Sequence, residues 1–316
     1  MSEQVQEEPA ARSPLARLMG VIISPGETFQ DIERRPGWLF PMVTYMAIFA
    51  ICFGVYAMKA DWIGIVTEQI EENPFMSFAP EDRRDTIINE ALAGMRKQSQ
   101  GQMAADNVIN VTATFVPFYH LMTLVYCTLF VMTGSLTSLR LGSAWLNFLL
   151  CLLLLTVFWV IIFVARSTFS DAPQSALLLI GLGAVAMTGG WIWLLNRQAA
   201  KDEVFHKMLS VGTYATAVGI IGSLAILGVS LATEGAIEVR VDRLVTSSLG
   251  QILKPEGAVI RAVLDRIDVF SLWTLTVLTI GYRAVTRLST GVTASITLLP
   301  WGVYSLCMIA LAAVFG

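Results

Sequence analysis

Long apolar runs alternate with polar stretches along this 316-residue chain. A helix that crosses the hydrocarbon core of a bilayer needs about 20 mostly apolar residues, because its backbone must satisfy its own hydrogen bonds there. The pattern therefore predicts an all-α, polytopic integral membrane bundle of about seven transmembrane helices. The predicted spans are Leu39–Met58, Val108–Thr133, Ala144–Ala165, Gln174–Leu195, Val211–Ala232, Val269–Val285 and Val292–Val314.

The segment before the first span, residues 1–38, has the pattern of a cytoplasmic tail followed by two short interfacial helices. In the first helix, apolar residues recur at helical spacing, at Leu15, Leu18, Met19 and Ile22. This spacing predicts an amphipathic helix that lies on the membrane surface. Ser24, Pro25 and Glu27 form the pattern of a capping box that starts the second helix, which is expected to end near Arg34. The aromatic residues expected at the lipid interface are Trp38, Phe40, Trp191 and Trp193.

The membrane domain, residues 39–316, contains two segments that are too polar for hydrocarbon, 59–107 and 233–267. Both carry apolar residues at helical spacing, among them Trp62 and Ile65 in the first and Leu249 and Leu253 in the second. We therefore expect a helical cap outside the membrane, to which both segments contribute.

Composition agrees with a membrane protein and narrows its partners. Hydrophobic residues make up 55% of the chain and charged residues only 14%, whereas a soluble domain carries about 25% charged residues. The expected partners are therefore membrane lipids, other membrane proteins or further copies of the chain. A formal net charge of −3 gives no basic field for nucleic acid, which is not an expected partner.

Basic residues in the short loops indicate the orientation of the spans. The residues that alternate sides consistently are Arg34, Arg35, Arg140, Arg197, Lys201, Lys207, Arg283 and Arg287. Because cytoplasmic loops are enriched in lysine and arginine, this pattern predicts a cytoplasmic N-terminus. An odd number of crossings then places the C-terminus outside.

Three stretches of the chain resemble the Yip family, membrane proteins named for their interaction with Ypt/Rab-type GTPases, and specifically its bacterial-type Yip-one domain. They are LARLMGVIISPGETFQDIERRPGWLFP near the start, FHKMLSVGTYATAVGII at 205–221 and IDVFSLWTLTVLTIGYRAV at 267–285. The resemblance implies a membrane-organising or adaptor role in a bacterial cytoplasmic membrane. The DLYGP motif of eukaryotic members does not precede the first span here, so direct GTPase binding is not expected.

His120 is the only histidine inside a predicted span, and ionisable groups at that depth are often functional. Two interpretations are open: a neutral imidazole hydrogen-bonded to a neighbouring helix, or a polar cavity shared with Asn110 and Asn147. With His206 as the only other histidine, no metal site and no cofactor are predicted.

A second set of residues has the pattern of partner or lipid contacts, at Leu18, Phe29, Arg34, Arg35, Asp268, Arg283 and Arg287. Asp268, at the start of the sixth span, is expected either to recognise a partner or headgroup or to serve as the N-cap of its helix. Arg283 and Arg287 complement the C-terminal end of that helix and lie where lipid phosphates are found.

The chain has no GxSxG elbow, HExxH pair or phosphate-binding loop, and no paired carboxylates within a span. No catalytic residue and no enzymatic activity are therefore predicted. The first hypothesis is a non-enzymatic membrane scaffold or adaptor that acts through protein or lipid interactions. The alternative is a transporter or channel for an uncharged or lipidic solute, lined by the second span. A polar cavity beside His120 and Asn147 would favour transport, and a dry bundle would favour the scaffold.

Overall fold

The computed structural model describes residues 12–71, 76, 80–136, 141–150, 152–153, 156 and 174–315. Every regular element in this part of the chain is a helix. Five helices are long and apolar enough to cross a membrane, at Leu39–Lys59, Gln100–Met132, Glu203–Ala232, Val269–Thr286 and Thr290–Val314. The prediction of a helical membrane protein is thus confirmed. The count of seven spans stays a prediction, since most of the third span lies outside the described residues.

The helices are α1 (Pro14–Ile23), α2 (Pro25–Arg34), α3 (Leu39–Lys59), α4 (Trp62–Glu71), α5 (Glu81–Met95), α6 (Gln100–Met132), α8 (Gln174–Ala199), α9 (Glu203–Ala215), α10 (Ala217–Ala232), α11 (Val241–Leu244), α12 (Leu249–Leu253), α13 (Ala258–Asp265), α14 (Val269–Thr286) and α15 (Thr290–Phe315), with one further helix at Leu141–Leu150. The fourth predicted span forms α8, which is not among the five candidate spans.

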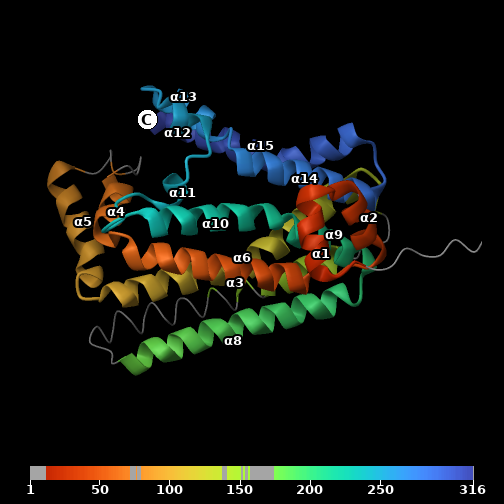
Figure 1. Cartoon of the computed structure of the whole chain (residues 1–316), viewed down its shortest axis with the longest axis horizontal. Coiled ribbons are helices and arrows are strands. Elements are labelled where there is room, and N and C mark those ends of the chain that lie inside the picture. The colour runs from red at the N-terminus through yellow and green to blue at the C-terminus, as the bar shows by residue number, and fades with distance from the viewer. Residues whose placement is uncertain are drawn as a thin grey trace, which may run out of the picture.

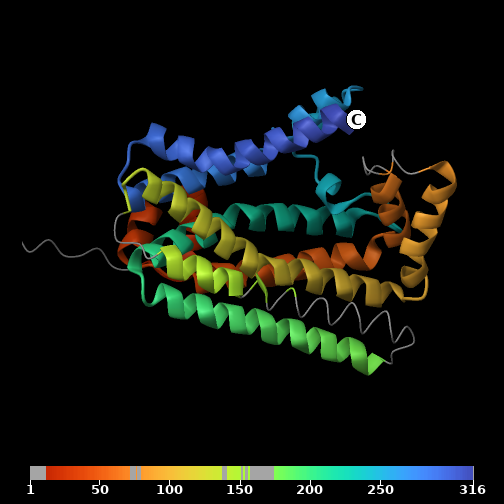
Figure 2. The same cartoon turned by 180° about the vertical axis from the view of Figure 1, so that it is seen from behind.

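The long helices lie side by side along one axis (Figure 1). The hairpin of α1 and α2 closes one end of this bundle, and α4 and α5 lie at the other end. Figure 2 shows α6 crossing the bundle from the end that carries α5 to the end that carries α1. The C-terminus lies at the end opposite the hairpin of α1 and α2 (Figure 1).

Small residues let α10 pack closely along α3. Ala217 and Ser223 are buried, and a Cβ atom added at Gly219 would lie 2.9 Å from Cε2 of Tyr45. The backbone of α10 therefore approaches the Tyr45 ring at a distance that only glycine allows. Small residues serve the same purpose where helices meet inside membranes, because dispersion contacts at short range drive their association there.

The fifth span is longer than predicted, and its helix is interrupted at Thr216, where α9 ends and α10 begins. Hydroxyl groups donate to carbonyl oxygens of the preceding turn, with distances of 2.7 Å from Ser210 to His206, 3.0 Å from Thr213 to Leu209 and 2.6 Å from Thr216 to Thr213. Such bonds compete with the backbone N–H groups for the same carbonyl oxygens. The interruption thus has a cause in the local sequence.

The buried side chains form two cores. The larger core lies toward the hairpin of α1 and α2, and the smaller core joins α3 to α4 and to residue Ile237. An isolated bridge pairs Ala60 with Ile237, in which the N–H of Asp61 donates to Ile237 O at 2.8 Å. The two polar segments therefore meet at this end of the bundle, as expected.

Candidate functional site

The hairpin of α1 and α2 packs into the bundle through Leu18, Phe29 and Ile32, while Leu15, Met19 and Ile23 of α1 stay exposed, so the membrane-surface position of α1 stays a prediction. Leu18 is 5% exposed, and the side chains of Phe29 and Ile32 are fully buried in the larger core. A Cβ added at Gly281 of α14 would lie 3.0 Å from Cε1 of Phe29, so this glycine makes room for the ring. Leu18 and Phe29 are consequently not available for contact with lipid or a partner.

A buried ion pair holds the two helices of the hairpin together. Arg17 Nε lies 2.7 Å from Asp31 Oδ2, and the two side chains are only 8% and 19% exposed. Arg17 Nη1 also donates to the carbonyl oxygen of Arg35 at 2.7 Å, just after α2 ends. Hydrogen bonding of this quality is what a buried charge requires, because desolvation costs several kcal/mol per ion. The sequence pattern did not predict this pair.

A second ion pair ties the hairpin to the bundle. Lys207 Nζ, at the start of α9, lies 2.9 Å from Glu33 Oε1 of α2 and 2.9 Å from Glu203 Oε1. The ammonium group thus bridges α9 and α2 through Lys207 and Glu33, which are 174 positions apart in the sequence. With the packing of Phe29, this bridge fixes α2 against α9.

The start of α2 differs from the predicted capping box. Ser24 is the N-cap residue, but its side chain makes no capping hydrogen bond. The Oγ1 atom of Thr28 donates to Ser24 O at 2.9 Å instead, and Glu27 forms an ion pair with Arg12 at 2.9 Å. Arg12 binds both side chains, since its Nη1 also donates to Thr28 Oγ1 at 3.0 Å. Glu27, the acidic residue expected in the capping box, thus forms an ion pair with Arg12, which precedes α1.

The same end of the bundle carries exposed basic side chains. Arg34 and Arg35 are exposed at the end of α2, and Arg283 and Arg287 are exposed at the end of α14. The two helices lie side by side (Figure 1), with Phe29 beside Gly281. The exposure of these four arginines agrees with their predicted place among partner or lipid contacts.

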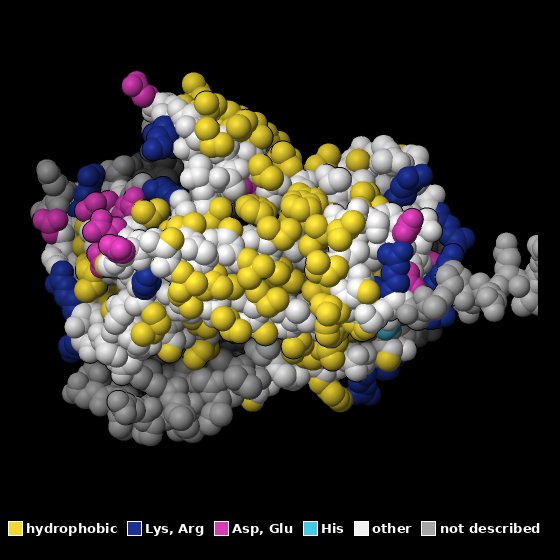
Figure 3. Space-filling view, in the orientation of Figure 1, with side chains coloured by type: hydrophobic (Ala, Val, Ile, Leu, Met, Phe, Trp, Pro, Cys, Tyr) yellow, Lys and Arg dark blue, Asp and Glu magenta, His cyan; other side chains and the backbone are white. Residues whose placement is uncertain are grey.

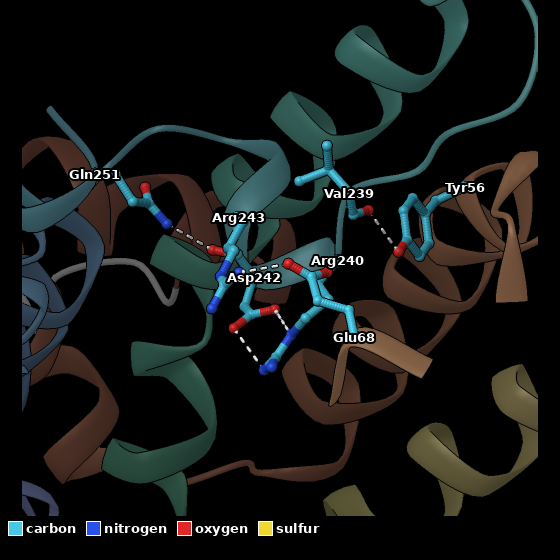
Figure 4. Close-up of polar contacts among 7 residues, drawn as sticks. All are labelled: Tyr56, Glu68, Val239, Arg240, Asp242, Arg243 and Gln251. Carbon is cyan, nitrogen blue, oxygen red and sulfur yellow. Dashed lines mark hydrogen bonds and ion pairs between the residues drawn. The ribbon is translucent and has the colours of Figure 1, made fainter. Parts of the chain in front are cut away.

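At the opposite end, polar contacts join α3 and α4 to α11 (Figure 4). Tyr56 Oη donates to Val239 O at 3.0 Å, and Arg243 Nη1 donates to Glu68 Oε1 at 3.0 Å. Arg240 binds both carboxylate oxygens of Asp242 at 3.0 Å. These contacts explain how the first and second polar segments form one cap.

Lys59 caps the C-terminal end of α10. Its ammonium group donates to Ser230 O at 2.8 Å and to Thr233 O at 2.7 Å. The last carbonyl groups of a helix have no partner within the helix and carry partial negative charge. A lysine there supplies both a hydrogen-bond donor and a positive charge. This contact secures the end of α3 against the end of α10.

His120 is buried among aromatic side chains. Its Nδ1 atom accepts a hydrogen bond from Trp191 Nε1 of α8 at 3.0 Å, and the rings of Phe148, Trp191 and Phe205 pack edge-on around it. Because an indole N–H can only donate, the neutral imidazole carries its proton on Nε2. This arrangement matches the interpretation of a neutral imidazole bonded to a neighbouring helix.

The residues proposed to share a cavity with His120 do not gather around it. His120 is 1% exposed, whereas Asn110 and Asn147 are both exposed on the outside of the bundle. Asn110 lies ten residues before His120 on α6, which corresponds to about 15 Å along a helix. The three residues therefore do not form a common polar cavity.

Two tryptophans expected at the lipid interface are in fact buried. Trp38 is part of the larger core, and Trp191 donates to His120. Trp193 is exposed, with the Arg197 guanidinium 5.5 Å from the centre of its ring, as an interfacial position requires. The indole of Trp191 faces inward because the histidine supplies a hydrogen-bond acceptor there.

Asp268 is an N-cap, which was one of its two expected roles. Its Oδ1 atom accepts a hydrogen bond from the backbone N–H of Ser271 at 2.7 Å, at the start of α14. The side chain thereby satisfies one of the four free N–H groups at this helix end. Its position is explained without a partner.

The contact between His120 and Trp191 makes a testable prediction. His120→Leu or Trp191→Phe alone leaves one buried polar atom without its partner, and each is expected to cost about 1–3 kcal/mol. The double variant removes both polar groups and is expected to cost clearly less than the sum of the two. The free energy of unfolding in mixed micelles measures this coupling. Strictly additive costs would show that the hydrogen bond contributes nothing.

A comparison of the chain with models of known families, with curated proteins and with solved structures gives no match in any of the three. Within the described residues, no group of three or more histidine, cysteine, aspartate or glutamate side chains is placed to hold a metal ion. The fold and its apolar helices define the class, which is that of helical membrane proteins.

Proposed function

We propose that this protein is a non-enzymatic membrane scaffold or adaptor of the Yip type, which binds its partners at the end formed by α1, α2 and the end of α14. The observation that carries the proposal is the docked hairpin, held by the Arg17–Asp31 pair and by the buried ring of Phe29. A platform held this firmly presents its surface residues in a fixed arrangement, which lowers the entropic cost of binding. The resemblance of three stretches to the Yip family supports the same role.

The distribution of charge supports a cytoplasmic position for this platform, in a bacterial cytoplasmic membrane. Basic residues outnumber acidic ones at this end. The basic residues are Arg12, Arg17, Arg34, Arg35, Arg197, Lys201, Lys207, Arg283 and Arg287, and the acidic ones are Glu27, Asp31, Glu33, Asp202 and Glu203. At the opposite end, segments 59–107 and 233–267 together contain 14 acidic and ten basic residues. Figure 3 shows charged side chains at the two ends and hydrophobic ones between them. This is the asymmetry of the positive-inside rule.

The exposed arginines define the chemistry of the partner. Arg34, Arg283 and Arg287 carry guanidinium groups that match carboxylate and phosphate groups geometrically. The partner is therefore an acidic protein segment or the anionic headgroups of the adjacent leaflet. Basic residues near such a surface contribute about 1 kcal/mol each.

The test replaces the three arginines together, as Arg34→Gln, Arg283→Gln and Arg287→Gln, in protein purified into native-lipid discs. The matched control carries Arg83→Gln, Arg96→Gln and Lys97→Gln, three exposed basic residues at the opposite end. Three contributions of about 1 kcal/mol correspond to a loss of about 100-fold in affinity for co-purifying proteins or anionic lipids. The control is expected to retain full binding. Equal binding by both variants, or an equal loss in both, would contradict the proposal.

A further inference from the structure

The short helices α12 and α13 form a hairpin that leaves the polar cap and packs against α15 (Figure 1). The Arg266 guanidinium, directly after α13, lies 5.2 Å from the centre of the Tyr304 ring. Tyr304 is in the half of α15 that leads to the C-terminus, so the hairpin lies beside this half of the helix. Within 233–267, α11 contacts α4 through Arg243 and Glu68, whereas α13 packs against α15.

Some polar side chains of this hairpin are bonded within the protein, whereas Lys254, Glu256 and Arg261 are exposed. Ser248 Oγ lies 3.1 Å from Asp265 Oδ1, and Gln251 Nε2 donates to Asp242 O at 2.9 Å. Gly250 is buried, and a Cβ added to it would collide with the side chain of Asp265. The carboxylate thus sits between α12 and α13, on the inner side of the hairpin.

The apolar side chains of the hairpin point outward. Those that are exposed are Leu249, Ile252, Leu253, Val259, Ile260 and Val263, and we call them the α12–α13 patch. Leu253 is 63% exposed and Ile260 is 58% exposed. At 100° per residue, Val259, Ile260 and Val263 lie within an arc of about 100° on α13, and Asp265 lies on the opposite side. Figure 3 shows hydrophobic side chains gathered over α13.

This arrangement is the reverse of what water imposes on a surface helix. In water, an amphipathic helix turns its apolar stripe to the core and its polar side chains to solvent. Here the apolar arc of Val259, Ile260 and Val263 is exposed while Asp265 lies on the opposite, inner side of α13, an orientation that an apolar surrounding medium favours. From this orientation of α13 we infer that the α12–α13 patch is immersed in the acyl chains at the membrane interface, as the binding surface of a lipid-anchored hairpin.

Two further observations favour lipid over a protein partner. The start of α14, where Val269 and Leu272 are exposed, lies beside the start of α12, since the N–H of Leu249 donates to Ile267 O and that of Val269 to Ser247 O. Lys254 and Arg261 are exposed beside the patch, where their long side chains reach the phosphate level while their stems stay in apolar surroundings. A hairpin with an apolar face and flanking basic residues is typical of interfacial anchoring.

The experiment places a nitroxide spin label at Ile260→Cys in the full-length chain, after Cys52, Cys127, Cys151 and Cys307 have been replaced by alanine. Val263→Cys is a second position on the same face, and Ile87→Cys on α5, which is also exposed, is the matched control in the cap. The labelled proteins are reconstituted into vesicles of phosphatidylethanolamine and phosphatidylglycerol. Collision rates with oxygen, which concentrates in lipid, and with a nickel chelate, which stays in water, are measured by electron paramagnetic resonance.

At residues 260 and 263 the ratio of oxygen to nickel collisions is expected to be severalfold higher than at residue 87. A ratio at 260 and 263 equal to that at 87 would overturn the inference, because it would place the patch in water. Spin–spin broadening with low access to both reagents would also overturn it, since a second copy of the chain would then cover the patch. Neither result bears on the arginine surface at the opposite end, so the two proposals fail or stand separately.

Discussion

Arg17→Ala is expected to lower the free energy of unfolding by about 3–5 kcal/mol, because it leaves the Asp31 carboxylate buried without its counterion. The Asp31 side chain is 19% exposed. Within the described residues its ion-pair partner is Arg17, at 2.7 Å. The same change also removes the donor to the carbonyl oxygen of Arg35. Thermal or denaturant unfolding in mixed micelles measures the loss.

The Arg12–Glu27 pair provides the control for this prediction, since it joins the same two helices at the surface. Its side chains are 36% and 74% exposed, and Glu27→Gln is expected to cost less than about 1 kcal/mol. Equal costs for Arg17→Ala and Glu27→Gln would mean that the inner pair is solvated. The docked hairpin would then lose its main polar support.

Phe29→Ala is expected to cost about 3–5 kcal/mol, because it opens a cavity where a fully buried ring fills the space between α2, α9 and α14. The adjacent Gly281 cannot fill that space, since it has no side chain. We expect α2 to become accessible to protease under conditions in which the remainder of the bundle stays folded. Limited proteolysis, together with the unfolding measurement, reports both effects.

Phe40→Ala is the matched control, because this ring lies at the start of α3 and is exposed. Its removal is expected to change stability little in micelles, where detergent covers the same surface. If Phe29→Ala were as mild as Phe40→Ala, the hairpin would not be docked through the ring. The fixed platform proposed for partner binding would then have no structural basis.

The apolar runs in the sequence predict the long helices well, because no other backbone structure in this chain satisfies its hydrogen bonds in hydrocarbon. The same runs do not predict which side chains face protein. Leu18 and Trp38 are buried, whereas Leu15 and Met19 are exposed, and nothing in their apolar character separates the two pairs. When the solvent is lipid, the inner and outer faces of a helix have similar composition.

The candidate site was predictable in part. The exposure of Arg34 and Arg283 follows from their place at helix ends, and the N-cap role of Asp268 follows from its place before α14. The Arg17–Asp31 pair did not follow, because it depends on how α1 turns back on α2. The separation of His120 from Asn147 likewise depends on packing between helices, which the sequence pattern does not specify.

The contact between Tyr56 and Val239 has a consequence for biosynthesis, since 183 residues separate the donor from the acceptor. At 5–20 residues per second, a ribosome needs about 10–40 s to make the intervening chain. During that interval, the residues that bind Tyr56 and Lys59 have not been translated. The contacts at this end of α3 can therefore form only after α10 and Val239 have been made.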